Sequence, residues 1–185
     1  QGTEIYGKKV GLVGYGRLGQ IVARYLRAFE ARVVAADPKF PVGQREAGVE
    51  VVELAQLLAE SDIVSLHVDL NPATRGFFTG ALFGQMKWGS YFLNTARGEL
   101  IEEAGLLACL KEGRLRGAAL DVVSNETSAG MAGHPLIAYA RANRNLLITP
   151  HLGGCTLESK TKTELYLAGK LADLLGAGAP EAKAS

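Results

Sequence analysis

The stretch KKVGLVGYGRLGQIVARYLRAFEARVVAAD, from Lys8 to Asp37, decides the fold of this chain. It opens with a β-rich run, Lys8–Val13, that breaks at Gly14. Apolar residues then recur at helical spacing, and Arg32–Ala36 forms a second β-rich run that ends at Asp37. The order strand, glycine turn, helix, strand is typical of a doubly wound α/β fold. The residues at helical spacing are Leu18, Val22, Tyr25, Leu26 and Phe29.

The glycine turn matches the pattern G-x-G-x-x-G through Gly14, Gly16 and Gly19. The pattern alone is common, but here it lies between a predicted strand and an amphipathic helix, and Asp37 follows eighteen residues after Gly19. Gly14 allows a tight turn, Gly16 lets the backbone approach a pyrophosphate, and Gly19 lets the helix pack on the sheet. The helix N-terminus adds N–H donors and a favourable dipole. We therefore predict a dinucleotide site.

The acid at the end of the second strand indicates which dinucleotide binds. A carboxylate at Asp37 can accept hydrogen bonds from both hydroxyls of the adenosine ribose, and it would repel a 2′-phosphate. The sequence therefore favours NAD over NADP. Lys39 is a weak signal in the other direction, because a nearby cation could soften that repulsion.

The rest of the chain repeats the alternation of short apolar runs and helical-period segments. We expect an α/β, Rossmann-type, doubly wound and mostly parallel sheet of about seven strands with helices on both faces. The dinucleotide-binding domain is predicted to cover 1–176, with a last helix from about Leu157 to Leu175 and a flexible tail over 177–185. The five further strands are predicted at Val49–Val52, Asp62–Val68, Tyr91–Thr95, Ala118–Val122 and Leu146–Thr149.

Three polar residues follow strands of the predicted sheet, where open parallel sheets bind their ligands. They are Arg97 in NTARGE, Glu126 in ALDVVSNE and His151 in ITPHLGG. Each alone is more often a solvated or structural residue. Together they suit hydride transfer to a 2-keto acid: an arginine holds the carboxylate, a histidine moves the proton, and a glutamate orients the histidine. The cofactor carries the hydride.

Composition excludes several classes of function. Twenty Lys and Arg residues against nineteen Asp and Glu residues give a formal charge of +1, and 48% of residues are apolar, which disfavours disorder and nucleic-acid binding. No apolar run approaches the ~18–20 residues of a membrane span, and we expect a cytoplasmic protein. Cys109 and Cys155 lack the spacing of a zinc site and are expected to be reduced.

These strings resemble the NAD-binding domain of the D-isomer-specific 2-hydroxyacid dehydrogenases. The match extends from KKVGLVGYGRLGQ through NTARGELIEEAGLLACLKEGRLRGAALDV to TPHLGGCTLES. The resemblance implies that Arg97 orients the substrate, that His151 is the general acid/base, and that Glu126 partners the histidine. It also implies cofactor contacts at Arg17 and Leu18 beside the pyrophosphate, at Asp37 on the ribose, at Val68, at Thr95, Ala96 and Asp121 near the nicotinamide, and at Gly153 and Gly154 against it.

Two positions depart from the family pattern, and a third residue, Glu126, disfavours one branch of the family. Family members commonly carry proline after the catalytic glutamate and after the position of Val68, whereas this chain has Thr127 and Asp69 there. A formate-dehydrogenase-like branch typically has glutamine in place of Glu126. Such enzymes also have a substrate lobe, which we expect to be absent from this chain, so that NAD binds with little or no turnover of a 2-hydroxy or 2-keto acid.

Two alternatives to a dehydrogenase cofactor domain stay open. One is a non-catalytic NAD-sensing interaction module, like the corepressor relatives, and the other is a folded remnant without function. The resemblance also implies a homodimer through the NAD domain. Its candidate contact surfaces are FFTGALFGQMKWG and HPLIAYA, with Trp88 and Phe83 as first candidates, although ordinary core is an equally good interpretation of these apolar strings.

Overall fold

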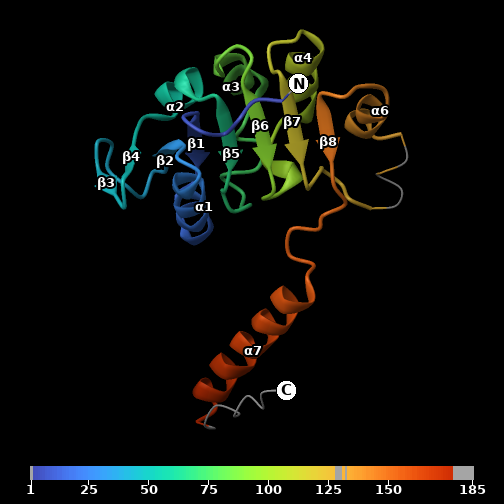
Figure 1. Ribbon diagram of the computed structural model, residues 1–185. Helices are drawn as coiled ribbons and strands as arrows, with labels where there is room; N and C mark the ends of the chain where they lie inside the picture. Colours follow the sequence, from blue (N-terminus) through green and yellow to red (C-terminus); the bar gives the residue numbers. More distant parts are fainter. Residues whose placement is uncertain (1, 128–130, 132, 177–185) are drawn as a thin grey trace. The chain divides into compact units, whose positions relative to one another are not determined.

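The computed structural model describes residues 2–127, 131 and 133–176. The chain divides into two compact units, Gln1–Pro150 and His151–Ser185 (Figure 1).

The first unit is built on an eight-stranded sheet with the order β3-β4-β2-β1-β5-β6-β7-β8 (Figure 1). All neighbouring strands are parallel except β3 and β4, which form an antiparallel hairpin. The strand order reverses direction at β1, whose neighbours are β2 and β5, and ligands of such sheets bind at this switch point. The strands are β1 (Lys9–Val13), β2 (Arg32–Ala36), β3 (Arg45–Glu46), β4 (Val49–Val51), β5 (Ile63–Leu66), β6 (Tyr91–Asn94), β7 (Gly117–Leu120) and β8 (Leu146–Ile148).

Helices cover both faces of the sheet and bury two apolar clusters. Ala23 of α1 packs with Val10, Val33 and their neighbours in one cluster. Leu57 of α2, together with apolar residues of α3, α4 and α6, packs on the other face in the larger cluster. The predicted α/β Rossmann-type fold is thereby confirmed. Within the described part of this unit, the helices are α1 (Arg17–Ala28), α2 (Leu54–Glu60), α3 (Gly80–Gln85), α4 (Glu103–Lys111) and α6 (Pro135–Ala142), and a 3₁₀ turn lies at Gly98–Leu100.

The sheet has one strand more than the seven predicted. The additional strand, β3, is only two charged residues long, so it has no apolar alternation to detect. It pairs with β4 across a turn in which Ala47 and Gly48 both have positive φ, the backbone geometry of a tight hairpin. The bounds of Arg32–Ala36 agree with those of β2, and the other predicted strands differ from the observed ones by at most two residues at either end.

Aromatic residues of the α3 region form the centre of the larger cluster. The rings of Phe78, Phe83 and Phe92 contact one another with centroids 4.7 to 5.2 Å apart. Phe83 is fully buried, so its prediction as a first candidate for a contact surface is wrong, and the core interpretation holds for it. Trp88 differs, because 67% of its surface is exposed, and the Arg114 guanidinium lies over its ring.

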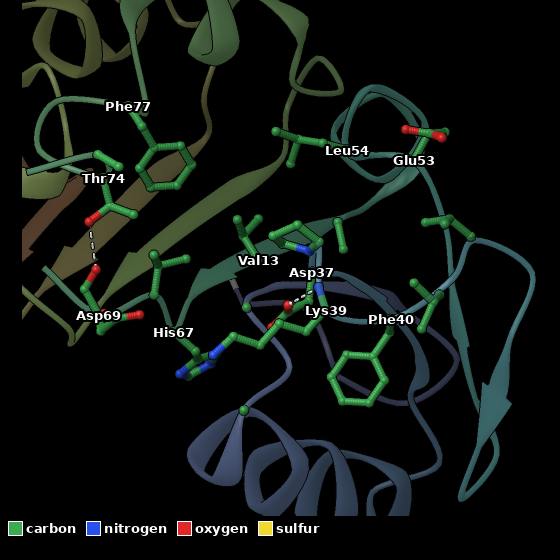
Figure 2. Close-up of a pocket in the computed structure, with 18 of the residues that line it drawn as sticks. Val13, Asp37, Lys39, Phe40, Glu53, Leu54, His67, Asp69, Thr74 and Phe77 are labelled. Carbon is green, nitrogen blue, oxygen red and sulfur yellow. Dashed lines mark hydrogen bonds between the residues drawn. The ribbon is translucent and has the colours of Figure 1, made fainter. Parts of the chain in front are cut away.

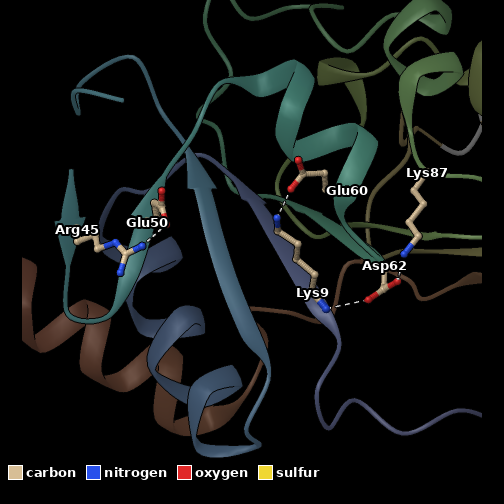
Figure 3. A network of polar contacts seen from close by, with 6 residues as sticks. All are labelled: Lys9, Arg45, Glu50, Glu60, Asp62 and Lys87. Carbon is tan, nitrogen blue, oxygen red and sulfur yellow. Dashed lines mark hydrogen bonds and ion pairs between the residues drawn. The ribbon is translucent and has the colours of Figure 1, made fainter. Parts of the chain in front are cut away.

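Ion pairs join the amino-terminal ends of the central strands (Figure 3). Asp62, just before β5, accepts hydrogen bonds from the Lys9 N–H at 2.8 Å and from the Lys87 Nζ at 2.7 Å, and Lys9 Nζ pairs with Glu60. Burial raises the pKa of the Asp62 carboxyl, but the hydrogen bonds from Lys87 and Lys9 outweigh it and the pKa is lowered. These charges lie at the sheet edge opposite to the carboxyl ends of the strands.

The second unit contains the predicted last helix, α7 (Leu157–Leu174). Thr156 caps it, because its Oγ1 accepts a hydrogen bond from the Ser159 N–H at 3.1 Å. The expected tail at 177–185 lies outside the described residues. Among the residues that the structure describes, no helix combines the length and the apolar character that crossing a membrane requires.

Candidate cofactor-binding site

A cleft of about 790 Å³ opens at the carboxyl ends of β1, β2, β4 and β5 (Figure 2). It therefore lies at the switch point of the sheet, where β1 separates β2 from β5. Four residues singled out from the sequence line it: Gly14, Gly16, Asp37 and Val68. Arg17 and Leu18 are exposed in the first turn of α1, directly after Gly16.

The glycine turn has the tight geometry that the sequence predicts. Gly14 has φ +96°, and a Cβ added there would lie 2.6 Å from the carbonyl oxygen of His67. A Cβ at Gly19 would lie 2.5 Å from the Gly14 carbonyl oxygen, so only glycine allows this approach of helix to turn. At Gly16 the space is open, and this residue caps α1 without a side chain. The helix therefore begins at a residue that lines the cleft, and no side chain caps its first turn.

Asp37 is held at the cleft by main-chain donors. Its Oδ2 accepts a hydrogen bond from the Tyr15 N–H at 2.7 Å, and its Oδ1 accepts one from the Lys39 N–H at 2.9 Å. Both are charge-assisted bonds, and each carboxylate oxygen retains a further lone pair for an incoming hydroxyl. The carboxylate is therefore fixed against the glycine turn before any ligand arrives.

Several cleft residues were not found from the sequence. Tyr15, between the lining residues Gly14 and Gly16, is buried and does not itself line the cleft, but its ring meets that of Phe40 edge-on with centroids 5.5 Å apart. Phe40 and Phe77 contribute apolar surface to the cleft. Asp69 also lines it, on the loop after β5. The apolar character of Phe40 and Phe77 was visible in the sequence, but their loops carry no periodicity that would place them in a site.

His67 ends the strand region of β5 and forms part of the cleft wall. Its Nε2 lies 3.0 Å from Ser65 Oγ, and its Nδ1 is buried without a hydrogen-bond partner among the described residues. Burial lowers the pKa of this imidazole, because desolvation penalises the charged form. A neutral ring therefore packs beside the glycine turn.

We predict that this histidine makes stability depend on pH. Its folded-state pKa is lower than its unfolded value, so the unfolded chain binds the proton first as pH falls below ~6.5. Its contribution to stability is thus complete above that pH and is lost as pH falls toward the folded pKa. Urea unfolding measures the free energy of unfolding at pH 7.5 and at pH 5.5. The decrease between the two pH values should be smaller for His67→Gln than for the native chain, and equal decreases would contradict the prediction.

The end of β6 presents Arg97 on a turn organised by a buried amide. Asn94 Nδ2 donates to the Arg97 carbonyl at 2.9 Å, and Asn94 Oδ1 accepts from the Ala96 N–H at 3.0 Å. Arg97 Nη1 donates to the Ala96 carbonyl at 2.6 Å, and the side chain is exposed. Thr95 is exposed and Ala96 half-buried on the same turn. Asn94, which sequence reasoning did not select, positions the turn.

The end of β7 carries the two predicted carboxylates. Asp121 is buried and accepts a hydrogen bond from the Thr149 hydroxyl. Glu126 Oε1 accepts one from the Val123 N–H at 2.9 Å. A Cβ at Gly98 would lie 2.0 Å from the Val123 carbonyl carbon, so the loops that carry Arg97 and Glu126 touch through their backbones. The structure thus places Arg97 and Glu126 on neighbouring loops.

His151 begins the second unit, with Gly153 and Gly154 exposed after it. The histidine has φ +52°, a left-handed conformation unusual for a residue with a side chain. Its carbonyl oxygen accepts a hydrogen bond from the Cys155 thiol at 3.3 Å, which closes a short turn before α7. Contact between this histidine and Glu126 stays a prediction.

Comparisons with known proteins match this arrangement. Residues 1–153 match the family described as D-isomer specific 2-hydroxyacid dehydrogenase, NAD binding domain. The chain is 39% identical over 184 residues to D-3-phosphoglycerate dehydrogenase of Mycobacterium bovis, covering 98% of this chain and 33% of that protein. It is similar to the NAD-complexed D-isomer specific 2-hydroxyacid dehydrogenase of Lactobacillus delbrueckii ssp. bulgaricus (TM-score 0.82, 30% identity, 98% of this chain and 56% of that one).

A further solved structure is similar in fold but was determined with a different cofactor. It is an acyclic imino acid reductase in complex with NADPH and D-Arg, with a TM-score of 0.80 and 29% identity. The match covers 96% of this chain and 54% of that one. The chain therefore spans between about a third and just over half of the length of these three proteins.

Proposed function

We propose, from the premise that this chain belongs to the D-isomer specific 2-hydroxyacid dehydrogenase family, that it binds NAD(H) as the cofactor domain of a D-2-hydroxyacid dehydrogenase. The observation that carries the proposal is the cleft in which Asp37 is fixed against the glycine turn at the carboxyl ends of β1 and β2. The Asp37 carboxylate supplies hydrogen-bond acceptors, and the uncapped N-terminus of α1 supplies N–H donors. A dinucleotide needs both.

The residues present fit this cofactor. The backbone of Gly16, Arg17 and Leu18 would hold the pyrophosphate, because no side chain caps the first turn of α1. Asp37 would accept hydrogen bonds from the adenosine ribose hydroxyls, and its charge would repel a 2′-phosphate. We therefore propose NAD rather than NADP, although the acyclic imino acid reductase relative was solved with NADPH.

We propose that three residues, each on a segment that follows a strand of the sheet, act in the hydride-transfer reaction. The nicotinamide supplies or accepts the hydride when it is bound. Arg97, exposed on the turn after β6, would hold the substrate carboxylate and polarise the adjacent carbonyl. His151 would donate or accept the hydroxyl proton, and Glu126 would orient it. Thr95, Ala96, Asp121, Gly153 and Gly154 are proposed to surround the nicotinamide end, with Val68 nearer the adenosine.

Calorimetric titration tests the proposal. NADH should bind saturably at one site per chain, and NADPH should bind at least about tenfold more weakly, because a phosphate would face the Asp37 carboxylate. The relatives are about two to three times as long as this chain, so little turnover of glyoxylate, hydroxypyruvate or pyruvate is expected from it alone. Absent NADH binding by a folded chain would contradict the proposal.

We also propose that the chain forms a homodimer through its first unit. The support is Trp88, an indole ring with 67% of its surface exposed. Sedimentation with and without NADH separates this proposal from the sensor alternative, in which the dimer forms only with the nucleotide. If the chain sedimented as a monomer with and without NADH at about 100 µM, on the order of the dissociation constant of a weak dimer, the homodimer proposal and the sensor alternative would both be contradicted.

A further inference from the structure

We propose that Asp69 recognises the 6-amino group of the adenine base, so that the cleft distinguishes adenine dinucleotides from those with a 6-oxo purine. The inference rests on the proposed function, because it requires that the adenosine half of NAD(H) occupies the cleft. It goes beyond that function by assigning base specificity to one side chain.

The cleft gives a flat base a place beside Asp69. Its walls away from the glycine turn are mainly apolar, and an aromatic base buries its faces favourably on such surfaces. Asp69 lies on the loop after β5, across the cleft from the loop that follows Asp37 (Figure 2). A base extending from a ribose held at Asp37 would meet these walls. The apolar lining includes Phe40, Val52, Leu54, Val68 and Phe77.

The loop after β5 fixes the Asp69 carboxylate before a ligand binds. Asn71 Nδ2 donates to Asp69 Oδ2 at 3.0 Å. The Asn71 side chain is itself held, because its Oδ1 accepts from the N–H groups of Ala73 and Thr74. The Thr74 hydroxyl donates to the Asp69 carbonyl oxygen at 2.7 Å. A pre-positioned acceptor loses little conformational entropy on binding, which favours specific recognition.

The charge state of Asp69 makes it a selective partner. The hydrogen bond from Asn71 and the attraction of Lys39 hold the pKa of its carboxyl below the ordinary value, so it is ionised at neutral pH. An ionised carboxylate only accepts hydrogen bonds. The 6-amino group of adenine donates to it, whereas the 6-oxygen of hypoxanthine is an acceptor and would be repelled.

Two other carboxylates line the cleft and must be distinguished from Asp69. Asp37 is engaged by the glycine turn and is assigned to the ribose. Glu53 directly precedes α2, and among the described residues its side chain makes no capping hydrogen bond, whereas Asp69 is held by Asn71. Glu53→Gln is therefore the matched control for Asp69→Asn, since each change removes one charge of the cleft and keeps the side-chain size.

The experiment compares NADH with deamino-NADH, which carries hypoxanthine, by calorimetric titration of the full chain. The native chain should bind deamino-NADH about tenfold or more weakly than NADH. Asp69→Asn should reduce this ratio to within about twofold, because an amide can rotate to donate to the 6-oxygen. Glu53→Gln should keep the native ratio.

The outcomes separate the inference from the proposed function. Saturable NADH binding by the native chain with a ratio near one would overturn the inference and leave the proposed function standing, and this result needs no variant. The inference would also be overturned if Glu53→Gln removed the preference for NADH over deamino-NADH while Asp69→Asn kept it. Absent NADH binding by the folded native chain would overturn both.

Discussion

Replacement of Asp37 by alanine is expected to weaken NADH binding by about tenfold to a hundredfold. Hydrogen bonds to a charged group contribute about 1.5–3 kcal/mol, and this carboxylate is the acceptor proposed for the ribose hydroxyls. The change also removes the acceptor of the Tyr15 N–H, at 2.7 Å, and so loosens the glycine turn. Calorimetric titration measures the affinity, and circular dichroism checks that the fold is retained.

Asp37→Asn is the conservative comparison for this prediction. The amide oxygen can still accept from the Tyr15 N–H, but the charge that faces a 2′-phosphate is gone. NADH affinity should fall less than in Asp37→Ala, and the preference for NADH over NADPH should shrink. If both variants bound NADH as tightly as the native chain, the assignment of Asp37 to the ribose would be wrong.

Replacement of Gly98 by alanine is expected to destabilise the first unit by about 3 kcal/mol, the upper end of the usual cost of overpacking. The added Cβ would lie 2.0 Å from the Val123 carbonyl carbon and 2.2 Å from its oxygen. These are backbone atoms, so no side chain can rotate away. The loops that carry Arg97 and Glu126 must separate, and urea unfolding measures the loss.

Gly84→Ala is the matched control, because a Cβ there meets nothing within 4 Å and the residue lies inside α3. Alanine is a better helix former than glycine, so this variant should be as stable as the native chain or more stable, by up to about 1 kcal/mol. A Gly98→Ala variant as stable as Gly84→Ala would show that the two loops do not touch as described.

The fold could be predicted because its signals are local. The glycine motif, the helix after it and the acid at Asp37 lie within thirty consecutive residues, and Gly14 and Gly19 take the steric roles that their spacing indicates. The two-residue strand β3 could not be predicted, because its pairing is set by the turn at Ala47 and Gly48 rather than by an apolar pattern.

The candidate site could be predicted only in part, since its remaining features depend on contacts between distant segments. Phe83 looks like a surface candidate in an apolar string, yet packing against Phe78 and Phe92 makes it core. Asn94 looks like an ordinary polar residue at the end of a strand until both ends of its amide meet the turn of Arg97. Such roles arise from tertiary structure, which a linear pattern does not encode.

The most direct test of the central claim is an NMR titration of the ¹⁵N-labelled chain with NADH, followed by amide shifts. If the dinucleotide binds on the glycine turn, saturable shifts are expected at Gly14, Gly16, Arg17 and Lys39, with little change at Asp62 on the opposite edge of the sheet. Shifts that leave the glycine turn unchanged and gather elsewhere, or no shifts in a folded chain, would contradict this binding mode.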